Sequence, residues 1–442
     1  MPAQDLTQGP VGTSLFKLTA PMMAGVSSSI LVSMLEIGFI GQLGTLPLAA
    51  ITFTFPMIMI LTSIALGIGI GTSSVIARGI GGGDRSDAQR LGTHSLLLVS
   101  VTMLVLSAIG MLYIDEVFTA LGAGPDLLPL IHSYLNIYYP TVVLFTLTMV
   151  AGNIMRASGS ANIPGVVMTL GALANLVLDP ILIFGWFGFP RMELAGAATA
   201  AAVTRFGTAG LLLYFVVRDD LVVTRDIFSG FAASTRKVLT IGLPAMATQL
   251  IGPVSAAIVT RLLASYGEVV VAGFGVATRI EAVAVMLLFA LSGSIGPFVG
   301  QNWGAKRPDR MREGVIVAYR FSIIWGVIAA AALALFGNEI VSLVDDSDSV
   351  IATAAFYLAV VPWSYGLWGV LMMASASFNA LGKPLPSTLL SFSRMFIIYV
   401  PLALMLDNWF GYPGIFIATA TSNALGGMLG FLWFRQRYFV DR

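Results

Sequence analysis

The chain has 442 residues, of which 57% are hydrophobic and only 10% are charged, and its formal net charge is +1. Soluble proteins carry about 25% charged residues, so this composition excludes a water-covered globule and predicts that most of the surface faces lipid. The small net charge gives no electrostatic basis for nucleic-acid binding, and the lack of cysteine excludes disulfides, thiolate metal sites and cysteine nucleophiles.

A helix that crosses a membrane needs about 20 mostly apolar residues. Twelve stretches of the chain meet this requirement: residues 18–40, 50–77, 92–114, 132–155, 163–187, 194–217, 238–264, 270–299, 314–336, 353–376, 386–406 and 413–434. The sequence therefore predicts an all-α integral membrane protein with twelve transmembrane helices. The polar residues 1–13 lack a signal-peptide pattern, so the first span is expected to direct insertion.

Lysine and arginine are distributed unequally between the loops on the two sides of the predicted membrane. Most of them fall in one set of loops and span ends, whereas the opposite loops contain only Arg191 and are rich in aspartate and glutamate. Basic loops stay on the cytoplasmic side. This asymmetry predicts a multi-pass protein of the plasma (inner) membrane with both termini in the cytoplasm.

The first span carries a carboxylate, Glu36, close to its outer end. A charged side chain at membrane depth costs about 2.5–3.5 kcal/mol on insertion scales, so it needs either a function or access to water. Glu36 is therefore a candidate for binding a coupling cation. The alternative is that it reaches water at the interface.

The fourth span contains Tyr138-Tyr139-Pro140. A phenol hydroxyl at membrane depth requires a partner. Tyr139 is therefore a candidate for contacting a substrate.

The fifth span carries the most informative intramembrane charge, Asp179, in the run Asn175-Leu-Val-Leu-Asp179-Pro180. Asn175 and Asp179 are four residues apart and share one helix face. Pro180 lacks an N–H, which frees the carbonyl oxygen of Leu176 and is expected to kink the helix. A carboxylate, an amide and a free carbonyl can hold a proton or a small hard cation such as Na⁺. The alternative is a hydrogen-bonded aspartate that only joins helices.

The two halves of the chain resemble each other at one fixed shift. Pro21 in residues 18–24 matches Pro244 in residues 241–247, which is 223 positions later (244 minus 21), and two further anchors keep this register. The sequence thus predicts two pseudo-symmetric six-helix lobes, residues 1–222 and 223–442, with a polar, basic linker at about 218–237. Duplicated helix sets are typical of secondary transporters.

The eighth span contains Arg279 and Glu281. Residues two apart on a helix do not face each other, so each needs a partner elsewhere. For Glu281 the first expectation is a structural ion pair to another helix, and a role in coupling is the alternative. Both residues are also candidates for substrate binding.

Enzymatic function is not expected. The chain has no H-E-x-x-H, Walker or paired-cysteine pattern, and the GxGD-like residues 81–84 fall in a basic loop outside the spans. No cofactor is predicted.

The chain resembles the multidrug and toxin extrusion (MATE) family along nearly its whole length. The residues that carry this resemblance are Glu36 with residues 41–44 (Gly-Gln-Leu-Gly), the Asn175–Asp179–Pro180 run, and residues 299–305 (Val-Gly-Gln-Asn-Trp-Gly-Ala). The carboxylates of spans one and five look more like the DinF-like bacterial branch than the NorM-like branch. Glutamate at position 36 departs from the aspartate usual in the family.

The resemblance implies a cation-coupled antiporter that uses H⁺ or Na⁺ entry to export organic cations and amphiphilic drugs by alternating access of two lobes. It implies cation-coupling roles for Asp179, Glu36 and Asn175, with Asp179 and Asn175 as possible Na⁺ ligands. It also implies substrate-binding roles for Asn153 and Thr199. A lipid or lipid-linked oligosaccharide flippase of the same superfamily is the first alternative, and a major-facilitator transporter is the second.

Overall fold

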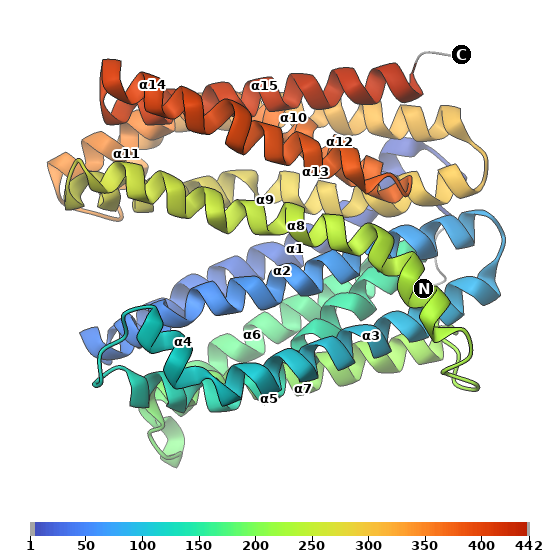
Figure 1. Ribbon diagram of the computed structural model, residues 1–442, viewed down its shortest axis with the longest axis horizontal. Coiled ribbons are helices and arrows are strands. Elements are labelled where there is room, and N and C mark those ends of the chain that lie inside the picture. The colour runs from blue at the N-terminus through green and yellow to red at the C-terminus, as the bar shows by residue number, and fades with distance from the viewer. Residues whose placement is uncertain (1–4, 440–442) are drawn as a thin grey trace. The chain divides into compact units, whose positions relative to one another are not determined.

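The computed structural model describes residues 5–439 of the chain. Within these residues the regular structure is helical, and twelve segments are long and apolar enough to cross a membrane. Figure 1 shows the helices coloured in chain order. The predicted all-α architecture with twelve spans is confirmed.

The chain folds into two compact units. Unit 1 is formed mainly by Lys17–Met246, and unit 2 is formed by Leu6–Phe16 together with Ala247–Arg442. The division at residue 246 lies inside a helix, whereas the sequence repeat places the boundary between the lobes at residue 222.

Unit 1 contains six spans and two short helical elements. Its helices are α1 (Val11–Gly41, from Lys17 onward), α2 (Thr45–Gly81), α3 (Arg85–Leu112), α4 (Ile114–Ala120), α5 (Leu128–Ala157), α6 (Asn162–Phe184), η1 (Trp186–Gly188) and α7 (Glu193–Arg218). The first half of α8 (Phe231–Ala264) also belongs to unit 1. Its core is built from buried aliphatic and aromatic side chains of α2, α3, α5 and α7.

Unit 2 contains the second half of α8 and five further spans. Its other helices are α9 (Glu268–Gly304), α10 (Pro308–Ser342), α11 (Asp348–Val360), η2 (Val361–Ser364), α12 (Tyr365–Ala380), α13 (Pro384–Phe392), η3 (Ser393–Tyr399), α14 (Val400–Phe410) and α15 (Tyr412–Tyr438). The tenth span is therefore α11, η2 and α12, and the eleventh is α13, η3 and α14.

The α-helix is interrupted near a proline in both of these spans. Pro362 lies in η2, a 3₁₀ segment, and Pro401 follows η3, a π-helical segment. Proline cannot donate the backbone hydrogen bond of an α-helix, and the neighbouring turns adopt other spacings. The apolar character of each span is unaffected, which explains why hydropathy predicts a single span in each case.

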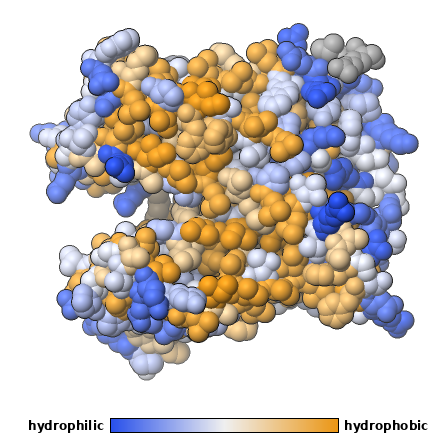
Figure 2. Space-filling model, in the orientation of Figure 1, coloured by the Kyte–Doolittle hydropathy of each residue, from blue (hydrophilic) through white to orange (hydrophobic). Residues whose placement is uncertain are grey.

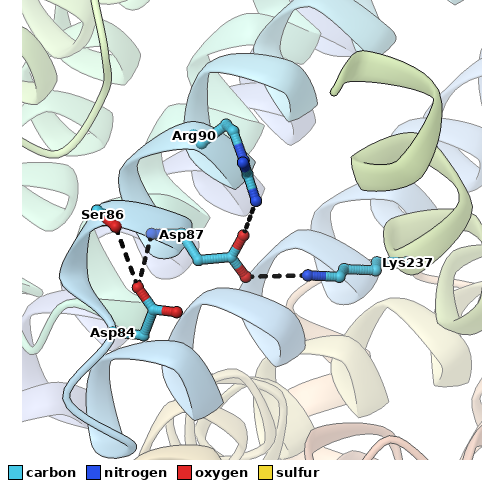
Figure 3. Close-up of polar contacts among 5 residues, drawn as sticks. All are labelled: Asp84, Ser86, Asp87, Arg90 and Lys237. Carbon is cyan, nitrogen blue, oxygen red and sulfur yellow. Dashed lines mark hydrogen bonds and ion pairs between the residues drawn. The ribbon is translucent and has the colours of Figure 1, made fainter. Parts of the chain in front are cut away.

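The first half of α8 is fixed to unit 1 by both apolar and polar contacts. Val238 and Ile241 are buried in its core. α2 approaches α8 so closely that a Cβ added to Gly71 would lie 2.5 Å from the carbonyl oxygen of Val238. Figure 3 shows the carboxylate of Asp87 in α3 accepting a hydrogen bond from Lys237 at 3.0 Å. These contacts explain why the unit boundary falls later than the repeat boundary.

The beginning of the described chain is held by unit 2 in a corresponding way. The amide of Asn302 and the guanidinium of Arg310 both donate to the carbonyl oxygen of Leu6, at 3.1 and 3.2 Å. Gln301 accepts a hydrogen bond from the N–H of Leu6 at 3.2 Å. Gln301 and Asn302 belong to the run at 299–305, so this sequence motif fastens the N-terminal segment.

Large apolar side chains are exposed along most of the spans in both units. Figure 2 shows hydrophobic residues over the middle of the visible face, with hydrophilic residues gathered toward its ends. This pattern fits a protein whose surroundings are lipid in the middle and water at the two ends.

Candidate functional site

The polar centre of unit 1 lies on α6. The Asp179 side chain is fully buried, with 0% exposure, and its Oδ2 accepts a hydrogen bond from the Asn175 amide nitrogen at 2.7 Å. Within residues 5–439, the other carboxyl oxygen, Oδ1, has no hydrogen-bond partner. Buried polar atoms are nearly always paired. The free Oδ1 is therefore a position at which a proton or a cation can bind.

A second helix orients the amide. The hydroxyl of Thr204 in α7 lies 3.3 Å from Asn175 Oδ1 and 2.9 Å from the carbonyl oxygen of Ala201. The single hydroxyl proton of Thr204 is shared between these two acceptors, and its contact with Asn175 Oδ1 agrees with an amide nitrogen that points toward Asp179. The arrangement is a chain of hydrogen bonds from α7 through Asn175 to the carboxyl group.

Glycines allow α6 and α7 to come this close. A Cβ added to Gly171 of α6 would lie 2.6 Å from Thr208 of α7. A Cβ added to Gly196 of α7 would lie 2.5 Å from the carbonyl oxygen of Leu182. Small residues at helix contacts bring backbones together in membranes. This contact places Thr204 within reach of Asn175.

Glu36 adds a second negative charge near Asp179. The charge of Glu36, which is half-buried on α1, acts on both Asp179 and Arg205. None of the ion pairs within residues 5–439 joins Glu36 or Asp179 to a basic side chain. The two acids therefore share one electrostatic environment without being neutralised by direct contact.

Arg205 is held by neutral partners on α5. Its guanidinium carbon lies 4.5 Å from the ring centre of Tyr138 and 5.5 Å from that of Phe145. One guanidinium nitrogen lies 3.4 Å from the hydroxyl of Thr141. Cation–π contacts of this kind contribute about 0.5–2 kcal/mol. The positive charge of Arg205 thus remains available near Glu36.

The residues suited to Na⁺ are few. The described residues contain no group of three or more His, Cys, Asp or Glu side chains arranged to hold a metal ion. Asn175 directs its nitrogen, not its oxygen, toward Asp179. A sodium ion at Asp179 would require the amide to turn, whereas a proton at Oδ1 would not.

The other predicted contact residues of unit 1 have contacts of their own, and none of them hydrogen-bonds to Asp179 within residues 5–439. Tyr139 packs on α3, where a Cβ added to Gly110 would lie 2.6 Å from its ring. Asn153 accepts a hydrogen bond from Arg156 at 3.0 Å, and Thr199 donates to the carbonyl oxygen of its own helix at 2.8 Å. Tyr139 and Asn153 are fourteen residues apart on α5, so they are separated by about 21 Å along the helix axis.

In unit 2, Glu281 occupies a hydrogen-bonded pocket. Its Oε2 accepts from the hydroxyl of Tyr357 at 2.8 Å and from that of Tyr365 at 2.9 Å. Within residues 5–439 it forms no ion pair, so its partners are phenols rather than the basic side chain expected for a structural ion pair. Arg279 is exposed on the same helix.

A second polar group lies near Glu281. Arg394 in η3 donates to Asn423 Oδ1 at 2.8 Å, and the Asn423 amide donates to the Ser364 hydroxyl at 3.2 Å. The charge of Arg394 acts on Glu281. π-Helical turns occur often at functional sites. Sequence reasoning singled out Glu281 but not the tyrosines that donate hydrogen bonds to it, which come from another span of the chain.

Comparison with known proteins agrees with this architecture. A family model described as MatE matches residues 21–181 and, separately, residues 244–405. The chain belongs to the MATE family. The two matches begin at Pro21 and Pro244, the same residues that anchor the internal repeat.

Individual MATE relatives resemble the chain over nearly its full length. An FAD transporter from Shewanella oneidensis is 34% identical over 96% of this chain and 94% of that protein. The multidrug export protein MepA from Staphylococcus aureus is 25% identical over 98% of this chain and 96% of that protein.

Solved transporter structures share the fold. The crystal structure of the Vibrio cholerae MATE transporter VcmN in the bent form has a TM-score of 0.92 and 28% identity, with 97% of both chains covered. A MOP superfamily transporter from Pyrococcus furiosus has a TM-score of 0.91 and 27% identity, with 98% of this chain and 97% of that chain covered. The protein is thus a multi-pass membrane transporter and not an enzyme.

Proposed function

We propose that this MATE transporter exports amphiphilic compounds in exchange for an inward-moving cation, and that Asp179 binds that cation. The observation that carries the proposal is the buried Oδ1 of Asp179, which has no hydrogen-bond partner within residues 5–439. Asn175 orients the carboxyl group, and Glu36 adds a second negative charge.

The chemistry follows from the charge of the acidic pair. With both carboxylates ionised, the region attracts a cationic substrate, and binding of a proton to Asp179 removes one of the two negative charges. The substrate and the coupling ion then compete for the same charge, which is the requirement for exchange. A ligand shifts a conformational equilibrium only through different affinity for the two states. The neighbouring Pro180, which leaves the carbonyl oxygen of Leu176 without its helical donor, gives α6 a point at which it can bend.

Protons fit the observed arrangement better than sodium. A proton requires one acceptor, which Oδ1 supplies, whereas Na⁺ requires several oxygens and a turned Asn175 amide. Both termini are proposed to lie in the cytoplasm, so the coupling ion enters from the opposite side.

Substrate contacts are proposed on both units. In unit 1 these are Tyr139, Asn153 and Thr199, and in unit 2 they are Glu281 and Arg279. The phenols around Glu281 supply aromatic surface beside a carboxylate, which suits an organic cation.

A second candidate substrate is an anionic aromatic compound such as FAD. One relative of the chain is described as an FAD transporter. FAD carries two phosphates and two aromatic ring systems. Arg205, which stacks on Tyr138 without an acidic partner within 4.0 Å among the described residues, is suited to recognise both features.

The deciding experiment is transport into vesicles that contain the purified protein, with a pH gradient or a Na⁺ gradient imposed separately. We expect a pH gradient alone to drive uptake. Asp179→Asn should reduce the gradient-driven rate at least tenfold, which corresponds to about 1.4 kcal/mol or more in activation free energy. Asp126→Asn removes an exposed acid elsewhere in unit 1 and serves as the matched control.

The outcomes separate the alternatives. Undiminished transport by Asp179→Asn would remove this residue from the mechanism, and drive by Na⁺ alone would replace the proton. Transport of FAD but not of cationic dyes would select the second substrate class. Binding of a lipid-linked sugar without drug or FAD transport would favour a flippase.

A further inference from the structure

A groove runs along the surface of unit 2, away from the polar groups described above. It has a volume of about 630 Å³ and is formed by side chains of α10, α12 and α15, among them Tyr319, Arg320, Ile324, Leu367, Met428 and Leu432. Apart from Tyr319 and Arg320, every lining residue is apolar.

Glycine contacts explain the shape of the groove. A Cβ added to Gly326 of α10 would lie 2.2 Å from the backbone nitrogen of Gly366 at the start of α12. A Cβ added to Gly427 of α15 would lie 2.1 Å from the carbonyl oxygen of Leu367. α12 therefore packs closely on both neighbours and forms the floor, where Val370 is buried, while α10 and α15 form the two walls.

The exposed walls face hydrocarbon. Ile324 is 60% exposed on α10, and Met428 is 49% exposed on α15. In a membrane-spanning segment, such apolar side chains are solvated by acyl chains. A groove with walls of this kind has the width and chemistry to take up an acyl chain.

Arg320 places a positive charge at one end of this apolar surface. α10 has 35 residues, so it is about 52 Å long and exceeds the roughly 30 Å hydrocarbon layer by about 11 Å at each end. Arg320 is twelve residues from the first residue of α10, or about 18 Å along the axis. A long arginine side chain reaches the headgroup level from this depth.

The charge of Arg320 is uncompensated. The side chain is exposed, and no ion pair or hydrogen bond within residues 5–439 includes it. Arginine at such a depth normally pairs with an acid or a polar group. Its guanidinium is suited to a phosphate, with which it forms two parallel hydrogen bonds.

Tyr319 supplies an independent indication of a ligand. The residue lines the groove and is only 5% exposed, yet its hydroxyl has no hydrogen-bond partner in the part of the chain described. Its ring is fixed edge-on against Phe431 and Phe434, at 5.8 and 6.5 Å between ring centres. A buried phenol without a partner is uncommon, and a shift of this side chain toward the groove would bring its hydroxyl to a polar group of a bound molecule.

We propose that this groove binds an anionic phospholipid, with the phosphate on Arg320, an ester or phosphate oxygen near Tyr319, and one acyl chain between α10 and α15. Charge complementarity selects the anionic headgroup, and the apolar walls select a lipid over a soluble phosphate. The site is separate from Asp179, so the proposal does not depend on the transport mechanism.

The test is native mass spectrometry of the purified full-length protein in detergent, titrated with phosphatidylglycerol or with phosphatidylcholine of the same acyl chains. We expect one phosphatidylglycerol to bind more tightly than the others and more tightly than phosphatidylcholine. Arg320→Gln should weaken it roughly tenfold, and Tyr319→Phe roughly two- to tenfold, as expected for loss of a charged and a neutral hydrogen bond.

Two further variants separate lost binding from lost folding. Arg437→Gln removes an exposed arginine of α15 outside the groove and should leave the affinity unchanged within about twofold. Leu432→Trp keeps Arg320 but fills the groove, and it should abolish the tight binding of phosphatidylglycerol. Melting temperatures identify any variant that is unfolded.

Three results would overturn the proposal. The first is equal affinity for the two phospholipids, and the second is equal affinity of wild type and Arg320→Gln for phosphatidylglycerol. The third is displacement of the lipid by glycerol phosphate at comparable concentrations. The last result would assign the site to a soluble phosphate rather than a membrane lipid.

Discussion

Replacement of Gly427 by alanine tests the packing of unit 2 most directly. A Cβ at this position of α15 would lie 2.1 Å from the carbonyl oxygen of Leu367 and 2.6 Å from its carbonyl carbon. Favourable contacts between non-bonded heavy atoms lie at about 3.5–4.0 Å. The two helix backbones would have to separate by about 1 Å or more, because neither contacting atom belongs to a movable side chain.

The expected cost follows from two opposing effects. Alanine is a better helix former than glycine by about 1 kcal/mol, which favours the variant. Overpacking costs about 1–3 kcal/mol, and a clash with backbone belongs at the upper end of this range. Gly427→Ala should therefore lower the free energy of unfolding by about 1–2 kcal/mol.

Gly252→Ala is the matched control. Gly252 is also helical, in α8 of unit 2, and a Cβ there would meet no atom within 4 Å. It should be neutral or stabilising by up to about 1 kcal/mol. Both free energies are measured by equilibrium unfolding in mixed SDS micelles. Equal stability of the two variants would refute the close backbone contact between α12 and α15.

Further predictions concern polar contacts. Tyr365→Phe removes one of two hydroxyls from Glu281, and it should destabilise the protein by about 1 kcal/mol in the same unfolding assay; an unchanged value would exclude this bond. Lys237→Ala removes a partly exposed ion pair with Asp87, and it should lower the free energy of unfolding by under about 1 kcal/mol. This loss should be smaller at high salt, and a loss that does not depend on salt would contradict the prediction. The hydrogen bond to Asp407 raises the pKa of the Tyr266 phenol above 10.0. Its stabilisation should therefore be present below about pH 10 and be lost as the pH rises through the raised pKa, and melting curves of Tyr266→Phe should lack this alkaline loss.

The sequence was sufficient to predict the spans because lipid imposes a requirement on every residue that faces it. It was less informative about where helices begin and break. The first span was predicted at 18–40, whereas α1 begins at Val11, because a helix can continue through polar residues such as Lys17 after it leaves the membrane. The 3₁₀ and π-helical segments change backbone spacing without changing hydropathy.

The polar site was predictable only where its parts are close in the chain. The Asn175–Asp179 hydrogen bond follows from four-residue spacing on a helix. The contacts of Thr204 with Asn175 and of Arg205 with Tyr138 were not predicted, because they depend on how α5, α6 and α7 pack. The roles of Asp179, Glu36 and Asn175 in coupling stay predictions until transport is measured.

The division of the chain into units has a consequence for what each repeat contains. The first repeat supplies Leu6–Phe16 to unit 2, and the second supplies its own opening residues, through Met246, to unit 1. Each repeat therefore completes its neighbour, as protomers do when they exchange identical elements. A homodimer made from one unfused repeat on this plan would be a domain-swapped dimer, and neither half, expressed alone, would contain all the residues of a finished unit.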